Sequence, residues 1–489
     1  MSPLRSRIAL LPFAAFAASS DLAAQRPGRP LIENVARAMG GRDRVLAVRT
    51  LVIEGTGDNF NLGQNPSPEA VLPRYEVTEF RRSIDFAGRR WLQDQTRVPR
   101  FTTGNTAPQR QRSGYDSVAF NIAADGTVAR GSARADVDRA NELLHHPIGF
   151  IQAALAPGVE LTEHARVSGL RHVRMNAGGN KLAMFIEPRT SLPVRIEKVG
   201  AHAMLGDVVI ETRMSDWRMV DGIRLPMRIA QWIDGRWPLS DLQLKSASLN
   251  ATLSDIGVTP EVRAAQPPAV AVNVTADSIA PGVWYLTGGS HHSVAIEMRD
   301  HLVLVEAPLS DARTLAVIRK ARELRPDKPL RSVINTHHHF DHAGGIRAAI
   351  AEGLTVVTHA GNARFFEGLA RRRHFVVEDA LAKSPRPARI ERVEGKRILT
   401  DGSRSVEIHH ISGNPHAGTF LMIYLPAERI LIEADAYNPP AANTTPGPAP
   451  FAPNLVENID RLGLRVDRVV PIHGGIFTMG DLRAAALRK

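Results

Sequence analysis

The stretch Ser332–Gly345, S-V-I-N-T-H-H-H-F-D-H-A-G-G, places His337, His339, Asp341 and His342 in the spacing H-x-H-x-D-H. An apolar pair leads in like the end of a buried strand, and a Gly-Gly pair followed by an apolar helical pattern leads out. A strand end and a tight loop can point alternate side chains at one spot. Imidazole nitrogen and carboxylate oxygen are ligands that suit Zn²⁺ and similar ions. A solvated polar loop is the alternative, but ligand-type residues at this density have few structural uses, so the stretch predicts a metal site.

This spacing resembles the signature of the metallo-β-lactamase superfamily, which lies on a strand-to-helix loop. The family completes its site with three later residues, and matching positions occur here. His416 lies in S-G-N-P-H-A-G-T-F, Asp435 in R-I-L-I-E-A-D-A-Y and His473 in V-V-P-I-H-G-G, the last two at the ends of apolar strands. The loop before His416 departs from the family's frequent G-H-T-P-G-H, although the ligand itself is kept. The resemblance covers about residues 275–489.

Carried over position by position, the resemblance implies two metal sites. The first ion would be held by His337, His339 and His416, the second by Asp341, His342 and His473, with Asp435 bridging them. We expect two Zn²⁺ per chain, with iron or manganese as alternatives. Two ions about 3.5–4 Å apart can share one hydroxide that attacks a substrate carbonyl or phosphoryl group. Asp341 would then be the catalytic residue, since it can orient that hydroxide and pass a proton to the leaving group.

The length and composition indicate more than one domain. A chain of 489 residues is too long for one ordinary domain, and 43% hydrophobic residues can build real cores. The net charge is +11, but arginine is scattered and no dense basic block occurs. We therefore expect no nucleic-acid partner and only a weak tendency towards peripheral contact with anionic membranes.

The N-terminus indicates export. Arg5 and Arg7 precede an apolar run from Ile8 to Ala18, followed by small residues. This is the pattern of a secretory signal peptide, which we assign to residues 1–25, with a disordered leader as the alternative. No later run approaches roughly 18 apolar residues, so we expect no transmembrane segment in the mature protein and a periplasmic or secreted location. The chain has no cysteine, which excludes the superfamily variants with a Cys ligand.

The pattern along the chain predicts an α+β protein. Residues 30–250 carry many alternating strands with turn signals between them, which favour one large curved antiparallel sheet. Helical patterns occupy residues 31–48, ending at a Gly-Gly pair, and residues 136–156. Residues 251–274 form a Pro-rich linker. For residues 275–489 the resemblance implies an αββα sandwich with the metals at one edge.

The N-terminal half also has a weak resemblance to the half-barrels of periplasmic lipoprotein-carrier proteins. It rests on the phrases E-P-R-T-S-L-P-V-R-I-E (Glu187–Glu197) and V-D-G-I-R-L-P-M-R-I (Val220–Ile229). Such a sheet could hold a lipid or an acyl tail, or support the second domain. We favour support or substrate gating, because a fold does not determine a function.

Three further residues are candidate substrate contacts. His291 and His292 lie in G-G-S-H-H-S, on a hairpin loop that often borders the pocket in this family, and Tyr437 follows Asp435 by two positions. An ordinary loop histidine and a packed strand-end tyrosine are the alternatives. His338 has the opposite strand parity to its neighbours, so we expect it to point away from the metals.

These observations predict an exported dinuclear zinc hydrolase that attacks an ester, lactone, thioester or amide bond, with the β-lactam as one member of that set, in a small-molecule or envelope-derived substrate. One alternative is a mononuclear iron sulfur dioxygenase of the same fold, which the second ligand set disfavours. Another is a non-catalytic lipid- or ligand-binding envelope protein, which the complete set of ligands disfavours.

Overall fold

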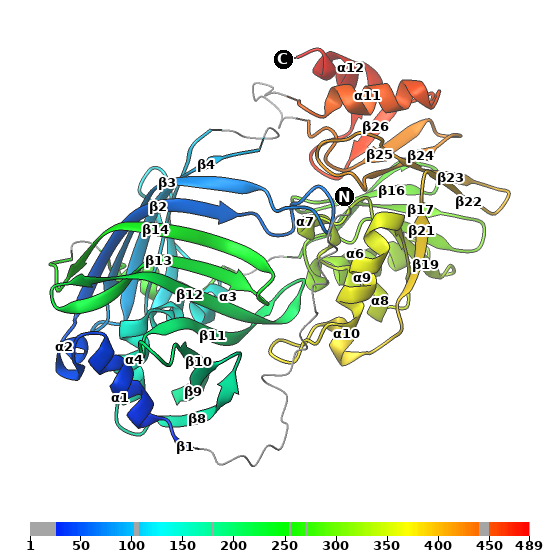
Figure 1. The fold of residues 1–489 in the computed structure, drawn as a ribbon. Helices are drawn as coiled ribbons and strands as arrows, with labels where there is room; N and C mark the ends of the chain where they lie inside the picture. The colour runs from blue at the N-terminus through cyan, green and yellow to red at the C-terminus, as the bar shows by residue number, and fades with distance from the viewer. Residues whose placement is uncertain are drawn as a thin grey trace, which may run out of the picture.

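The computed structural model describes residues 26–101, 107–177, 179–253, 256–268, 272–439 and 449–488. The expected signal peptide, residues 1–25, lies outside the described residues. The chain forms a large N-terminal sheet and a C-terminal part with two further sheets and helices around them (Figure 1). The expected α+β class, with a curved antiparallel sheet followed by a sandwich, is confirmed. Within the described ranges, no helix is both long and apolar enough to cross a membrane.

The N-terminal sheet has 14 strands in the order β1-β8-β9-β10-β11-β12-β13-β14-β2-β3-β4-β5-β6-β7. Neighbouring strands pair antiparallel, and glycine-, serine- and aspartate-containing turns with positive φ join several of them. The strands are β1 (Arg26–Pro27), β2 (Thr50–Phe60), β3 (Arg74–Asp85), β4 (Arg90–Pro99), β5 (Gln109–Asp116), β6 (Val118–Ile122), β7 (Val128–Arg130), β8 (Glu160–Val167), β9 (Leu170–Ala177), β10 (Asn180–Ile186), β11 (Pro193–His202), β12 (Gly206–Val220), β13 (Ile223–Ile233) and β14 (Trp237–Leu249).

One face of this sheet packs on short helices, and their apolar side chains form the first core. Ile32 and Val35 of the first helix and Phe150 and Ile151 of the fourth are fully buried in one cluster with strand residues such as Leu182. The helices here are α1 (Arg29–Ala38), α2 (Arg42–Leu46), α3 (Ala133–Ala140), the 3₁₀ turn η1 (Glu142–His145) and α4 (Pro147–Leu155), and α5 (Pro260–Ala264) follows the sheet.

The helical pattern expected over residues 136–156 is divided into three segments. The break falls at His146, whose extended backbone precedes Pro147 at the first position of α4. Proline disfavours a helical conformation in the residue before it, so one continuous helix cannot form there. The first helix ends before Gly40 and Gly41, whose φ angles of +133° and +118° suit glycine.

The C-terminal part contains a seven-stranded sheet, β15 to β21, and a six-stranded sheet, β22 to β27. The strands are β15 (Thr275–Ala280), β16 (Val283–Thr287), β17 (Ser293–Glu297), β18 (Leu302–Val305), β19 (Leu330–Ile334), β20 (Thr355–His359), β21 (Arg389–Val393), β22 (Lys396–Thr400), β23 (Ser405–His410), β24 (Leu421–Leu425), β25 (Ile430–Glu433), β26 (Arg468–Pro471) and β27 (Phe477–Thr478). The helices are α6 (Asp311–Leu324), α7 (Phe340–Ala343), α8 (Ile346–Ala351), α9 (Ala360–Arg371), α10 (Ala380–Lys383), α11 (Ala452–Arg461) and α12 (Met479–Ala486).

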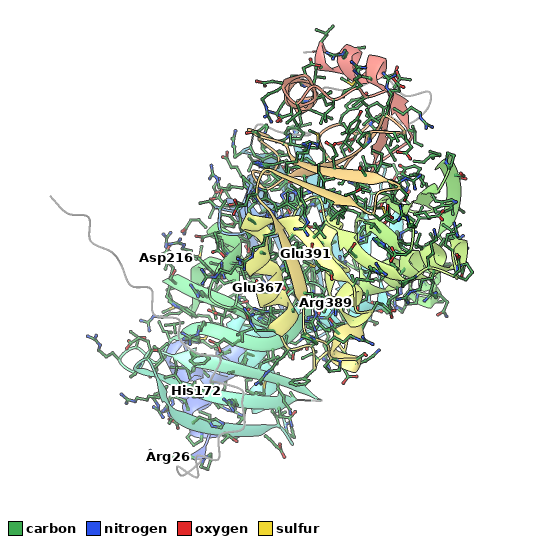
Figure 2. All side chains as sticks on the ribbon, turned by 90° about the vertical axis from the view of Figure 1, so that its right-hand side faces the viewer. Arg26, His172, Asp216, Glu367, Arg389 and Glu391 are labelled. Atoms are coloured by element: carbon green, nitrogen blue, oxygen red, sulfur yellow. The ribbon has the colours of Figure 1, made fainter. Side chains whose placement is uncertain are left out.

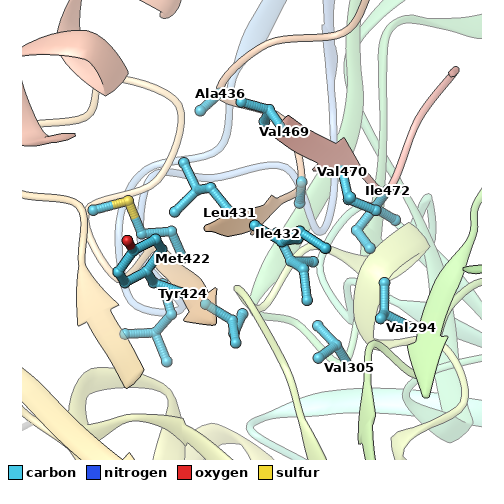
Figure 3. Packing of buried hydrophobic residues seen from close by; sticks show 14 of the residues in the cluster. Val294, Val305, Met422, Tyr424, Leu431, Ile432, Ala436, Val469, Val470 and Ile472 are labelled. Carbon is cyan, nitrogen blue, oxygen red and sulfur yellow. The ribbon is translucent and has the colours of Figure 1, made fainter. Parts of the chain in front are cut away.

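The core of this part lies between its two sheets. Val294 and Val305 of the first sheet lie near Ile432 and Val470 of the second, and all four are at most 1% exposed (Figure 3). A separate cluster holds α6, α8 and α9 on the outer face of the first sheet, and α11 and α12 pack on the second. The layers therefore follow the order helix, sheet, sheet, helix.

The edge strand β21 of the seven-stranded sheet is charged. Arg389 and Glu391 lie on it, and Glu367 of α9 lies nearby (Figure 2). The Glu367 carboxylate accepts a hydrogen bond from Arg392 of the same strand at 3.0 Å. Charged side chains of this kind discourage pairing of an edge with another chain.

The two sheet-rich parts are docked on each other. Leu205, in the turn between β11 and β12, and Val208 of β12 belong to the same buried cluster as the outer helices of the C-terminal part. Polar contacts extend this interface, because the Asp207 carboxylate accepts hydrogen bonds from the backbone N–H groups of Phe375 and Val376 at 2.9–3.0 Å. The N-terminal sheet is thus placed to contribute to a site on its neighbour.

The N-terminal core predicts a pH-dependent stability. His146 is 7% exposed and caps α4, and burial together with the nearby Arg82 lowers its pKa to about 3. The unfolded chain therefore binds the proton first, and stability is lost as pH falls from about 6.5 towards 3. His146→Asn, which keeps a capping oxygen, should reduce the loss of unfolding free energy between pH 7.5 and 4.5 by about 2–3 kcal/mol in urea titrations. His301→Asn in the other domain is the control, and equal losses in wild type and His146→Asn would contradict the assignment.

Candidate metal centre

The predicted ligands lie at strand ends that meet at one edge of the sandwich. His337 and His339 follow β19, and α7 begins at the next residue, Phe340. Asp435 follows β25 and His473 follows β26, and these two strands pair in parallel. Parallel strands end at the same edge, so side chains just beyond them come together although they are far apart in sequence.

One group of donors consists of His337, His339, His416 and Asp435, each offering one ligand atom within 4.8 Å of the others. The Nε2 atom of His416 lies 2.9 Å from Asp435 Oδ2 and 3.3 Å from His337 Nε2. His337 and His339 are at most 1% exposed, and Asp435 is 8% exposed. This group unites the residues expected around the first ion with the expected bridging carboxylate.

A second group consists of His291, Asp341, His342 and His473. The Nε2 atoms of His473 and His342 lie 3.2 Å apart. Asp435 reaches this group too, with Oδ1 at 2.9 Å from His473 and Oδ2 at 3.0 Å from His342. The Asp435 carboxylate therefore stands between the two groups, where a bridging ligand would have to be.

His291, which the sequence offered as a candidate substrate contact, lies beside the candidate metal donors Asp341 and His473. Its Nε2 atom is 3.2 Å from Asp341 Oδ2, and its ring packs edge-on against His473 with centroids 4.0 Å apart. The sequence offered a paired histidine on a loop but no spacing that linked it to the metal motif. The tertiary structure places it among the candidate donors of the second group.

The chemistry of these donors fits divalent metal ions. Two pairs of imidazole Nε2 atoms converge, those of His337 and His416 at 3.3 Å and those of His342 and His473 at 3.2 Å. The buried Nδ1 atom of His339 has no hydrogen-bond partner among the described residues. Imidazole and carboxylate without thiolate suit zinc and also accept manganese or iron, so the residues present fit the metal that the resemblance implies.

Glu306 contacts the candidate donor His342, although the sequence did not link it to the site. It is fully buried, its Oε2 atom lies 2.8 Å from His342 Nδ1, and it accepts the Thr336 hydroxyl at 2.7 Å and the Thr336 backbone N–H at 2.9 Å. Burial opposes a charge on His342, but Asp435 and Glu306 together raise its pKa well above the ordinary value. A carboxylate on the far nitrogen holds the ring so that Nε2 faces the site. A glutamate directly after an apolar strand was the only sequence signal.

Glu433 shapes the turn that carries Asp435. Its carboxylate accepts the backbone N–H groups of Ala436 at 2.9 Å and Tyr437 at 3.2 Å. Complete burial raises the pKa of Glu433 well above its usual range. It belongs to neither donor group, so its position supports a structural role.

The remaining histidine candidates lie outside both groups. The His338 ring is buried, with Nδ1 3.5 Å from Thr419 Oγ1, and the His292 ring packs edge-on against Tyr285 with centroids 4.9 Å apart. Burial, with Arg313 nearby, lowers the pKa of His292 to about 4. These surroundings favour the alternative of a packed neutral histidine, and the substrate contact expected for His292 stays a prediction.

A cavity of about 790 Å³ opens over the centre, between the two sheet-rich parts. Tyr437, the third predicted contact, lines it, and its hydroxyl accepts a hydrogen bond from Arg488 at 3.0 Å. Aromatic and apolar side chains dominate the walls beside the metal donors. The N-terminal part contributes Asn61, Gln64, Pro66, Val71, Pro73, Tyr75, Arg100 and Phe101, and the C-terminal part contributes residues that include Asp341, His416, Asp435, Ala436, Phe451 and His473.

The fold and these donors define a domain of the metallo-β-lactamase superfamily. Residues 286–473 match the family model described as the metallo-beta-lactamase superfamily. The resemblance expected for the C-terminal half is thereby confirmed, and the match supports the expected class of metal-dependent hydrolase. The resemblance of the N-terminal half to lipoprotein carriers stays a prediction.

Two curated relatives are similar in sequence over part of their length. The 2,4-dinitroanisole O-demethylase subunit alpha of Nocardioides sp. (strain JS1661) is 28% identical over 204 residues, which are 41% of this chain and 58% of that protein. A linear primary-alkylsulfatase of Pseudomonas sp. is 27% identical over 106 residues, 22% of this chain and 15% of that protein. The matched region thus spans less than two thirds of either relative.

Solved structures of metallo-β-lactamases also align with part of the chain. The enzyme from Pontibacter korlensis is 16% identical with a TM-score of 0.35, covering 44% of this chain and 97% of that structure. The enzyme from Hirschia baltica is 20% identical with a TM-score of 0.34, covering 44% and 96%.

The role of Glu306 can be tested by metal affinity. Glu306→Gln keeps the size of the side chain but removes the charge beside His342, and we expect zinc to bind about 10–100-fold more weakly. Competition with a chromophoric chelator measures this affinity. Glu323→Gln on the exposed face of α6, which removes a surface pair with Lys320, is the matched control. An unchanged zinc affinity in Glu306→Gln would show that His342 is positioned without it.

Proposed function

We propose that this chain is an exported, dinuclear zinc-dependent hydrolase of a small molecule with an apolar or aromatic part. The bond would be an ester, lactone, thioester or amide, with the β-lactam included in that set. The observation that carries the proposal is the pair of donor groups, in which Asp435 of the first lies 2.9–3.0 Å from His342 and His473 of the second, beside a cavity lined in part by aromatic residues. Export rests on the signal pattern of residues 1–25.

The donor groups favour two ions. His337, His339 and His416 would hold one, and Asp341, His342 and His473 the other, with Asp435 between them and His291 as a further donor to the second. When bound, divalent ions supply a water nucleophile of lowered pKa and positive charge that stabilises the negative charge of a transition state. A single-iron dioxygenase would leave the second group without a role.

Asp341 is the residue best placed to move a proton. Its Oδ2 atom lies 3.2 Å from His291 Nε2 and 3.8 Å from His342 Nε2, and its Oδ1 accepts a hydrogen bond from Gln64 at 2.8 Å. A carboxylate fixed in this way at the cavity wall can accept the proton of an attacking water and return it to the leaving group. Nearby aromatic side chains would bind the apolar part of the substrate and exclude bulk water.

The named relatives support a small substrate with an apolar portion. One is named for 2,4-dinitroanisole and the other for linear primary alkyl sulfates. Cavity walls that carry Tyr75, Phe101 and Phe451 suit an aryl or alkyl group, and Arg100 adds a cation at the N-terminal wall.

A substrate panel tests this function directly. The purified mature protein would be assayed on a lactone, a thioester, an aryl ester, a β-lactam and a phosphodiester, each with and without a chelator. We expect one bond class to be cleaved, the chelator to abolish the reaction, and Asp341→Asn to lower kcat by about 10²–10⁴-fold. Asp327→Asn, on an exposed pair with Arg325, is the control. Turnover that survives both the chelator and Asp341→Asn would refute the proposal.

The cavity wall predicts where substrate preference resides. Phe101 packs edge-on against Tyr75 with ring centroids 5.0 Å apart, on the wall opposite the metal donors of the C-terminal part. Phe101→Ala should raise KM for an aryl-bearing substrate about tenfold, since about 1.4 kcal/mol of apolar contact is lost. A substrate of the same bond class with only a methyl group should be unaffected. Phe375→Ala, at a residue that is 73% exposed, is the control.

A further inference from the structure

A short loop of the N-terminal part reaches into the metal centre. It comprises residues 62–66, between β2 and β3. The Gly63 carbonyl accepts the backbone N–H of Phe340 at 3.2 Å, and the Pro66 carbonyl accepts the backbone N–H of Gly418 at 2.7 Å. The loop therefore contacts both the segment that carries the H-x-H-x-D-H motif and the segment that follows His416.

The carbonyl of Asn65 fixes the orientation of one donor. His339 Nε2 lies 3.0 Å from this oxygen, and a carbonyl can only accept, so Nε2 carries the proton. The other ring nitrogen, Nδ1, is then free to bind a metal; it is buried, and none of the residues that the structure describes forms a hydrogen bond with it. A backbone oxygen on the far nitrogen of a ligand histidine is the usual means of setting its tautomer.

The side chain of Gln64 acts on the other donor group. Its amide donates to Asp341 Oδ1 at 2.8 Å. The second carboxylate oxygen, Oδ2, is left facing His291 and His342. One loop thus holds a donor of each group, and it does so from a domain that lies outside the match to the superfamily.

The loop is built to keep this position. The Asn65 side chain donates to the carbonyls of Ser67 at 2.5 Å and Ala70 at 3.3 Å, and Asn65 is 5% exposed. Gly63 has a φ of +82°, and a Cβ there would come within 2.3 Å of the Phe340 ring. Only glycine permits this approach, so the contact depends on a specific residue at the tip of the loop.

We propose that residues 62–66 form part of the metal centre. In this loop the Gln64 side chain positions Asp341, and the Asn65 carbonyl positions His339. This rests on the metal site of the proposed function. Metal affinity then depends on the docked N-terminal domain, and by linkage a bound ion stabilises the docked loop. The N-terminal domain acts as a second half of the centre and not only as a support.

Metal titration of the full-length protein tests the role of Gln64. Gln64→Leu removes the donor to Asp341 at similar size. Gln243→Leu is the matched control, because Gln243 also donates to an aspartate, Asp216, at 3.0 Å but within the N-terminal sheet. With Co²⁺ and Zn²⁺ as probes, we expect Gln64→Leu to weaken one of two bound ions about 10–100-fold and to alter the cobalt absorption spectrum of that site. The other ion and the control should match wild type.

Hydrogen exchange on the wild-type protein provides a measurement that does not depend on a folded variant. Zn²⁺ should slow exchange at the amide of Gln64 in the loop and at that of Ala70 just beyond it, which donate to the carbonyls of Asn61 and Ser67. Peptides of β9 should be unchanged. If Gln64→Leu binds two ions with wild-type affinity, or if Zn²⁺ does not change hydrogen exchange in the loop, the proposed role of the loop is wrong but the proposed function still stands. A wild-type protein that binds no ion would overturn the proposed function and this inference together.

Discussion

The carboxylate of Asp435 is the constraint on which the rest of the molecule depends. It is buried and lies 2.9–3.5 Å from the nearest nitrogens of four imidazoles, those of His337, His342, His416 and His473. So many polar groups lose their hydration here that the arrangement is unfavourable unless each group has a partner. Metal ions would coordinate both the nitrogens and the carboxylate oxygens. We therefore expect the site to stabilise the folded protein only when ions are bound.

The sandwich supplies the rigidity that this crowding requires. Strands β19, β25 and β26 end at the centre, and the apolar cluster between the sheets holds them with almost no exposed surface. The closely packed core fixes where each strand ends, so the loops beyond it have little freedom. Glu306 then sets the ring of His342 by a hydrogen bond, which packing alone could not do.

The sequence identified the six candidate ligands and the candidate bridging aspartate, which the structure brings close together, but it did not indicate their surroundings. These residues could be found because four of them lie within one short motif, Asp435 and His473 follow apolar strands, and His416 precedes one. The sequence named His291 only as a candidate substrate contact and did not indicate Glu306 or Gln64. The contacts that place these three residues at the site span 50, 36 and 277 positions of sequence, respectively. The helix expected over 136–156 is interrupted for a local reason. The prediction rested on the periodicity of the apolar residues and did not take into account that Pro147 disfavours a helical conformation at His146.

By itself the sequence determined the chemistry of the centre and the class of fold. The spacing of histidine and aspartate limits which atoms can converge, and alternating apolar residues limit where strands can run. Only the tertiary structure decided which domain completes the site. The cavity, the tautomer of His339 and the orientation of Asp341 arise where a loop of the N-terminal part meets the strand ends of the sandwich. Hydrogen bonds between segments hundreds of residues apart leave no periodic signal, because each requires only one donor and one acceptor at the right place in space.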